Sequence, residues 1–258
     1  MGNITLASRL RLAIAGLALW SSISSVSSAA DWQAVQEEVR SGNFDQALAT
    51  LEPLLNDRDE AAQRRARALA AQVLHLRGEE HFRQTRVAEA IADFERELKL
   101  QPSVAAEHWQ LGIAYYYAGE FEKGARQFEL HQTVNPQDVE NAAWHFLCIA
   151  RVADGSLERA RSKLIAVTRD QRVPMMKVHE MFAGKATVDD VLQTGKAAGE
   201  TAKFYADLYA GLYYEAIDQK DDSLRHVKLA AENPAARDNY MGDVARVHAA
   251  LRERTPRH

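Results

Sequence analysis

A pattern of small, aromatic and proline residues that recurs every 34 residues constrains this chain more than any other feature. The recurring residues are Gly78, Ala90, Phe94 and Pro102 in one copy, and Gly112, Gly124, Phe128 and Pro136 in the next. Small residues let two antiparallel helices approach closely, and an aromatic ring fills the remaining space between them. The proline has no backbone N–H and ends the second helix. Each copy is therefore expected to be a helix hairpin.

The spacing and the residue types resemble those of the tetratricopeptide (TPR) repeat, a helix hairpin of 34 residues. Tyr115 is expected between the two helices, and Gly119 in their turn, where a positive φ favours glycine. Cys148 and Gly211 occupy the small-residue position of two later copies. The resemblance implies an all-α fold, an α-solenoid of TPR helix hairpins. Its repeats are expected at about residues 31–58, 71–104, 105–138, 141–172 and 204–236.

The regular pattern breaks between residues 172 and 204, where we expect a degenerate pair of short helices joined at Gly184. Thr187 is expected to start the second of these helices, because a hydroxyl caps a helix and the following Asp189 and Asp190 favour its first turn. A capping helix is predicted over residues 237–253. The earlier helices are predicted at about 31–41, 44–56, 59–83, 87–100, 105–118, 121–134, 139–153 and 156–169.

Residues 1–30 have the pattern of a secretory signal peptide. Arg9 and Arg11 precede an apolar run over residues 12–20, and small residues follow up to Ala30. The apolar run is about half of what would span a bilayer, so cleavage and a periplasmic or secreted protein are expected. An uncleaved membrane anchor is the alternative. No cysteine lies near the predicted cleavage site, which argues against a lipid anchor.

The rest of the chain, residues 31–258, is expected to form a single TPR-type superhelical domain. The formal net charge of the chain is −4, and basic clusters are lacking, which argues against nucleic-acid binding. No membrane contact is expected beyond the signal peptide. Cys148 is the only cysteine, so an internal disulfide is excluded.

The TPR resemblance also implies a concave groove lined by the first helix of each hairpin. The residues expected in this groove are His75, Glu79, Phe82, Arg83, Trp109, Ile113, Tyr116, Tyr117 and His145. Aromatic and arginine side chains are the usual anchors of a protein-binding surface, so a protein or peptide partner is expected here. The alternative is that some of these aromatic residues are buried by a neighbouring repeat or by the C-terminal helix.

His145 and Cys148 form the most enzyme-like motif of the sequence, since residues three apart share one face of a helix. They could act as a base and a nucleophile. The repeat offers a simpler explanation, in which Cys148 is a small apolar filler. His75, Glu79 and His145 could share a metal ion only across different repeats, so neither a metal site nor a cofactor is expected.

The order of elements resembles that of the envelope TPR adaptors related to the bacterial lipoprotein NlpI. The segment FYADLYAGLYYEA in the last repeat adds to this resemblance, although the lipidated cysteine of that lipoprotein is missing here. The resemblance implies a non-catalytic adaptor that docks other proteins of the cell envelope. Two alternatives are a helical enzyme that uses His145 with nearby acids, and a self-assembling homodimeric structural protein.

Overall fold

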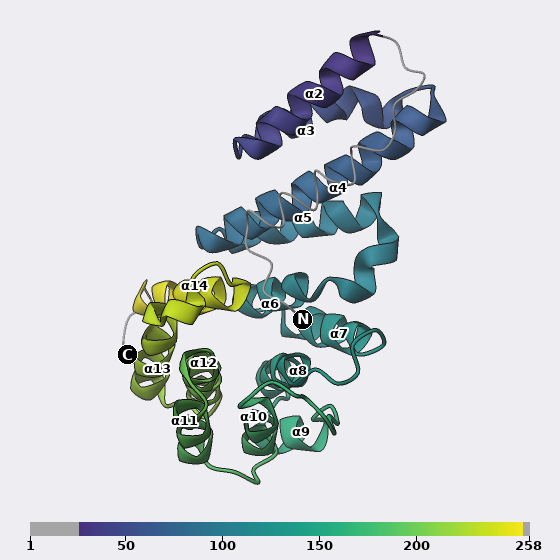
Figure 1. The fold of residues 1–258 in the computed structure, drawn as a ribbon. Coiled ribbons are helices and arrows are strands. Elements are labelled where there is room, and N and C mark those ends of the chain that lie inside the picture. Colours follow the sequence, from purple (N-terminus) through teal and green to yellow (C-terminus); the bar gives the residue numbers. More distant parts are fainter. Residues whose placement is uncertain (1–25, 255–258) are drawn as a thin grey trace. The chain divides into compact units, whose positions relative to one another are not determined.

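The computed structural model describes residues 26–254, with side chains from residue 32 onward (Figure 1). The elements are α2 (Val26–Arg40), α3 (Phe44–Leu51), η1 (Glu52–Asn56), α4 (Glu60–Arg83), α5 (Val87–Leu100), η2 (Pro102–Glu107), α6 (Trp109–Ala118), α7 (Phe121–His131), α8 (Val139–Arg151), α9 (Leu157–Ser162), α10 (Met175–Phe182), α11 (Val188–Ala197), α12 (Glu200–Ala216), α13 (Lys220–Glu232), η3 (Pro234–Ala236) and α14 (Tyr240–Arg254). No strand occurs in this range, which confirms the predicted all-α fold.

The predicted signal peptide lies mostly outside the described residues, which begin with α2 at Val26. Among the helices from α2 to α14, none combines the length and the apolar composition that crossing a membrane requires.

The described part of the chain divides into two compact units, one made of the residues up to His81 with Glu89–Val104 and the other of Phe82–Ala88 with the residues from Ala105 onward. The first unit has a core drawn from α2, α3, η1 and α4. Its members are Trp32, Val35, Val39, Ala47, Leu48, Leu51, Leu55, Ala66, Leu69, Ala70, Val73, Leu74 and Leu76. In the second unit α6, α7 and α8 pack in succession, α10 packs back on α8, and the helices from α10 to α14 again follow one another. A single domain over residues 31–258 stays a prediction.

The repeated glycines lie where the two helices of a hairpin meet. A Cβ atom added to Gly78 would lie 2.5 Å from Cε1 of Phe94, and one added to Gly112 would lie 2.7 Å from Cζ of Phe128. Both distances are shorter than a van der Waals contact, so each ring rests directly on the backbone of the facing helix. The two contacts join equivalent residues 34 positions apart, as the sequence pattern predicts.

Two further close approaches continue this packing in the second unit. A Cβ atom on Gly124 would lie 2.8 Å from Sγ of Cys148 and 3.2 Å from the carbonyl oxygen of Gly112. A Cβ atom on Gly211 would lie 2.5 Å from Cγ2 of Val227. The expectation that these small residues are tight points of contact between helices is therefore confirmed.

Several helix ends also follow the sequence signals. Gly119 ends α6 in the left-handed region with a φ of 79°, and Gly184 joins the short helices α10 and α11 with a φ of 73°. Thr187 caps α11, and Asp190 completes a capping box by accepting a hydrogen bond from the backbone N–H of Thr187 at 2.8 Å.

The predicted helix over residues 105–118 was wrong at its start, because α6 begins only at Trp109. Side chains from α7 bind the carbonyl groups of the preceding turn. Gln127 donates to the carbonyl of Ala105 at 2.7 Å, and Nδ1 of His131 lies 2.8 Å from the carbonyl of Ala106. These bonds replace the intrahelical ones that an earlier start would supply.

The predicted helix over residues 156–169 was also too long, because α9 ends at Ser162. Beyond it, the side-chain oxygen of Gln137 accepts from the backbone N–H groups of Thr168 and Arg169, both at 3.0 Å. Asp170 accepts from the N–H of Val139 at 3.3 Å. Side chains that bind the backbone in this way compete with helix formation.

We expect Gly112→Ala to lower the free energy of unfolding by roughly 1–3 kcal/mol, since the added methyl group overpacks the contact with Phe128. Shortening that ring with Phe128→Leu should cost less in the Gly112→Ala background than in the natural chain. A double-mutant cycle measured by denaturant unfolding would then give a coupling of about 1 kcal/mol. Fully additive costs would contradict the direct contact, and Thr201→Ala, at an exposed helical site, is the control.

Candidate functional site

The nine residues predicted to line a groove differ in how far they are exposed. Glu79, Phe82, Ile113, Tyr116 and His145 are buried, whereas His75, Arg83, Trp109 and Tyr117 are half-buried. A buried side chain offers no contact area, so the half-buried residues are the ones that can touch a partner in this conformation. His75 and Glu79 belong to the first unit and the other seven to the second.

In the second unit, the C-terminal helix α14 covers several of these residues. The ring of Tyr240 stacks on Phe82 with 5.6 Å between ring centroids, and it meets Trp109 edge-on at 5.0 Å. One turn further, the carboxylate of Asp243 lies 3.4 Å from Nε of Arg83. In this part of the chain, α14 therefore contacts three of the predicted groove residues, of which Phe82 is buried and Arg83 and Trp109 stay half-buried.

A polar cluster joins α14 to α6, α8 and α12. The hydroxyl of Tyr117 lies 3.1 Å from Nδ1 of His248, whose Nε2 lies 3.2 Å from Oε2 of Glu215. The other oxygen of Glu215 contacts Arg151 at 3.1 Å and Arg252 at 2.6 Å. One carboxylate thus connects two arginines and one histidine from two different helices.

The charge state of this cluster follows from its burial. Burial alone would raise the pKa of Glu215, but attraction from the facing cationic side chains, Arg252 and Arg151 among them, outweighs it and lowers the pKa, so the carboxylate is ionised. Burial lowers the pKa of His248 to about 4; the attraction of Glu215 opposes this shift, and the repulsion of Arg252 and Arg151 adds to it. The imidazole is neutral at pH 7. The imidazole shares a hydrogen bond with the hydroxyl of Tyr117 through Nδ1, and its Nε2 has no hydrogen-bond partner among the described residues although it faces Oε2 of Glu215.

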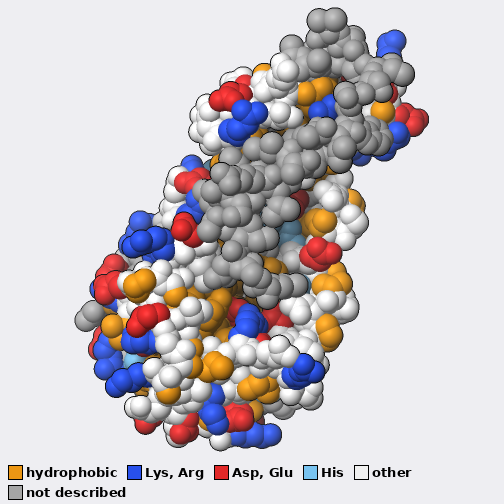
Figure 2. All heavy atoms as spheres, viewed as in Figure 1, with side chains coloured by type: hydrophobic (Ala, Val, Ile, Leu, Met, Phe, Trp, Pro, Cys, Tyr) orange, Lys and Arg blue, Asp and Glu red, His pale blue; other side chains and the backbone are white. Residues whose placement is uncertain are grey.

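Two more aromatic residues complete the cluster. Tyr116 and Trp144 meet edge to face with 5.3 Å between ring centroids, and Tyr117 lies edge-on to both rings. The guanidinium carbon of Arg151 lies 5.7 Å above the ring of Tyr116. Figure 2 shows hydrophobic side chains beside Lys or Arg side chains at the surface between the places that Figure 1 gives to α14 and α8. We call Tyr116, Tyr117, Trp144, Arg151, Glu215, His248 and Arg252 the α14 cluster.

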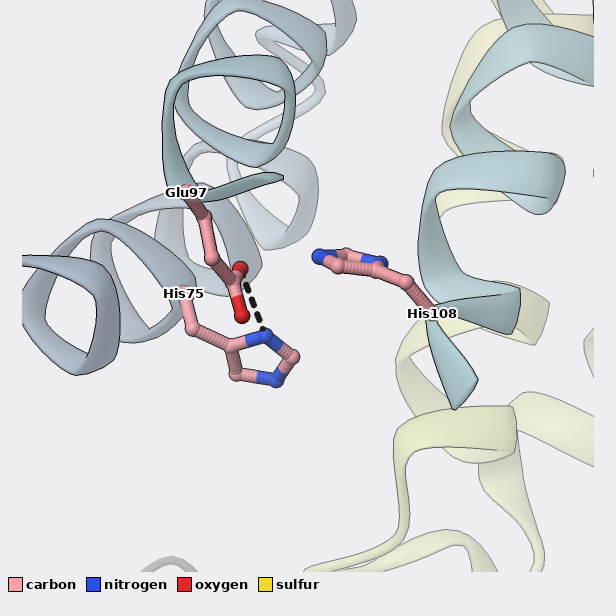
Figure 3. Close-up of side chains that lie close together, drawn as sticks. All are labelled: His75, Glu97 and His108. Atoms are coloured by element: carbon pink, nitrogen blue, oxygen red, sulfur yellow. Dashed lines mark hydrogen bonds and ion pairs between the residues drawn. The ribbon is translucent and has the colours of Figure 1, made fainter. Parts of the chain in front are cut away.

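The first unit contains a separate charged group around His75. Its Nδ1 lies 3.0 Å from Glu97, as the dashed line in Figure 3 marks, and its Nε2 lies 3.4 Å from Glu79. Burial alone would lower the pKa of His75, but hydrogen bonds and attraction from Glu79 and Glu97 raise it to about 10. The imidazolium charge is thus fixed at neutral pH and compensates two nearly buried carboxylates. This arrangement stabilises the packing of α5 on α4.

His145 and Cys148 do not have the features of a reactive pair. Cys148 is buried against Gly124, and burial raises the pKa of its thiol. Burial also lowers the pKa of His145, whose Nε2 lies 3.2 Å from the exposed carboxylate of Glu129. A protonated thiol without access to solvent is a poor nucleophile, which favours the packing role of Cys148.

Comparison with protein-family models and with curated proteins gives no match for this chain. The α14 cluster therefore has to be interpreted from its own geometry.

Sequence reasoning missed Arg151, Glu215, His248 and Arg252. His248 and Arg252 are four residues apart and so share one face of α14, which is a usable signal. The helix was expected to cap the end of the chain, and nothing in its sequence indicates which neighbouring helices that face meets.

We expect the neutral His248 to make the folded state less stable in acid. Above about pH 6.5 the imidazole is neutral whether the chain is folded or not. As the pH falls towards 4, the unfolded chain binds a proton that the folded chain excludes, so the free energy of unfolding drops by up to about 3 kcal/mol.

Denaturant unfolding across this pH range should show a shallower acid loss for His248→Gln than for the natural chain. The quantity compared is the slope of the free energy of unfolding against pH. A destabilisation by the substitution that is the same at every pH does not change this slope. Equal slopes would contradict a buried neutral imidazole facing Tyr117, Glu215, Arg151 and Arg252.

We expect the thiol of Cys148 to react with a disulfide reagent at least 100-fold more slowly in the native protein than in the unfolded chain, because it is buried and protonated. Absorbance of the released thiolate measures both rates. Fast native reaction would instead favour the enzyme alternative that uses His145.

Proposed function

We propose that this protein is a TPR-type α-solenoid of the bacterial envelope that binds a protein or peptide partner without catalysis of its own. The recurring contact between a glycine and a phenylalanine supports the repeat type, since Gly78–Phe94 and Gly112–Phe128 are equivalent pairs. The envelope location rests on the sequence of residues 1–30 and on the resemblance to the NlpI-related adaptors.

The observation that carries the binding function is the way in which α14 rests on predicted groove residues. Tyr240 packs on Phe82 and Trp109, and Asp243 lies against Arg83. This face therefore supplies rings and a guanidinium to a helical segment, which is the mode by which a groove holds an amphipathic helix. The same types of side chain can hold a segment of a partner.

A partner would use the side chains that α14 leaves partly accessible. Trp109 and Tyr117 are half-buried, and the side chains of Arg83, Arg151 and Arg252 keep 27%, 31% and 33% of their exposure. Tryptophan, tyrosine and arginine dominate the binding energy of most protein interfaces. A few such anchors on a rigid helical scaffold suffice for a specific adaptor.

The test is recovery of partners from an extract of the native envelope by the tagged protein. Trp109→Ala and Arg83→Gln should each reduce the yield of specifically bound proteins at least fivefold, measured by quantitative mass spectrometry. Leu229→Ala, which removes an exposed apolar side chain from α13, is the matched control and should leave the yield unchanged.

Thermal unfolding of each variant separates lost binding from lost folding. Unchanged recovery with both folded variants would overturn the assignment of this face.

A further inference from the structure

Helix α14 meets the earlier helices of its unit through side chains on one side of the helix. We call these side chains the α14 stripe; they are Tyr240, Asp243, His248 and Arg252. Tyr240 packs on Phe82 and Trp109. Asp243 lies against Arg83. The first half of the stripe therefore rests on the face that we assign to the partner.

The backbone of α14 is held by other contacts. The helix packs along α13 and on η3, the elements that precede it in the chain. A Cβ atom added to Gly242 would lie 2.0 Å from the carbonyl oxygen of Ala236, so the start of α14 packs directly on η3. Lys228 of α13 pairs with Glu253 at 2.5 Å, and η3 contains no titratable residue. The stripe can therefore separate from the earlier helices while α14 stays attached to α13 and η3.

His248 is the fully buried member of the stripe. Its Nδ1 lies 3.1 Å from the hydroxyl of Tyr117 on α6. Its Nε2 lies 3.2 Å from Oε2 of Glu215 on α12, and neither atom has a hydrogen-bond partner among the described residues. Arg151 of α8 and Arg252 of α14 contact the other oxygen of the same carboxylate. Charged groups from three helices thus act on one imidazole.

A proton on His248 is disfavoured while the stripe is packed in this way. It would place a third cation beside the single carboxylate of Glu215, in a site without contact to solvent. Burial lowers the pKa of His248 to about 4, and the attraction of Glu215 opposes this shift only in part. An imidazole in water has a pKa of about 6.5. Acid therefore favours any motion that exposes His248, and separation of the stripe exposes it.

We propose that α14 is an acid-sensitive lid over the binding face of this unit. Proton uptake by His248 accompanies separation of the stripe from α6, α8 and α12, and this separation uncovers Phe82 and Trp109 for the partner segment. The inference rests on the proposed peptide-binding function and adds the regulation of its site.

Thermodynamic linkage gives the size of the effect. In the open form His248 titrates with its ordinary pKa, whereas in the closed form it stays neutral until the pH approaches 4. The ratio of open to closed protein should therefore rise about tenfold between pH 7.5 and pH 5.5. Nearly all of this rise should occur below about pH 6.5, where the exposed imidazole binds its proton.

Hydrogen exchange of the full protein, followed by mass spectrometry, measures this ratio. The opening constant of Tyr240–Arg254, corrected at each pH for the intrinsic exchange rate, should rise about tenfold from pH 7.5 to pH 5.5. The opening constant of Phe121–His131, the helix α7 of the same unit, should change less than about twofold. This measurement on the natural chain tests the inference even where a variant does not fold.

His248→Gln is the decisive variant because glutamine keeps a polar side chain that does not titrate. The rise in the opening constant of α14 should disappear. His179→Gln is the matched control, since Nε2 of His179 lies 2.9 Å from the carbonyl oxygen of Ile165, outside the α14 cluster. This control should keep the tenfold rise.

Partner recovery separates this inference from the proposed function. Trp109→Ala should lower the recovery at pH 7.5 whether or not α14 opens in acid. The lid adds a second expectation. The recovery by the natural chain, divided by that of His248→Gln, should rise at least about threefold between pH 7.5 and pH 5.5.

An opening constant of α14 that does not change with pH would overturn the lid, and so would an equal rise in His248→Gln. An equal rise in α7 would overturn it too, because the unit would then open as a whole. A recovery ratio that stays constant with pH would overturn the regulation of the binding face. If Trp109→Ala still lowers recovery, any of these results leaves the adaptor function standing and removes only the lid.

Discussion

The close approach of helices at small residues is the interaction on which this fold depends. A phenylalanine ring lies on the backbone of the facing helix at Gly78 in the first unit and at Gly112 in the second. Such a contact brings many atoms of both helices to van der Waals distance, and each buried pair adds a small dispersion energy. Any side chain larger than hydrogen at these glycines would push the helices apart, and the dispersion energy of these contacts would be lost.

The α14 cluster uses a different kind of interaction for a different purpose. Apolar packing tolerates small rotations of a helix, whereas Glu215 holds Arg151, Arg252 and His248 at distances of 2.6–3.2 Å. A buried carboxylate with such partners is costly to move, because any displacement leaves a charge uncompensated. The network therefore fixes how α14 lies on its neighbours, and it holds the rings of Tyr116 and Trp144 beside an accessible guanidinium.

The same logic explains the irregular segment that follows α9. Arg172 contacts Asp138 and Asp170, both at 2.6 Å, and also Glu140, which accepts a hydrogen bond from Tyr209 at 2.7 Å. Side chains thus replace the backbone hydrogen bonds of a longer helix and connect α8 to α12. A loop stabilised in this way lets α10 pack on α8 although α9 is short.

The sequence by itself determined most of the helices and the tight contacts at Gly78 and Gly112. Glycine, phenylalanine and proline at fixed offsets act locally, through backbone freedom, close packing and a missing N–H, so Gly112, Phe128 and Gly119 could be placed in advance. Capping at Thr187 is local for the same reason. Tertiary structure alone decided the candidate site, because Glu215 lies 64 residues from Arg151 and 37 from Arg252. Which face of α14 meets which helix depends on how all the intervening helices are arranged in space. No local sequence pattern specifies that arrangement.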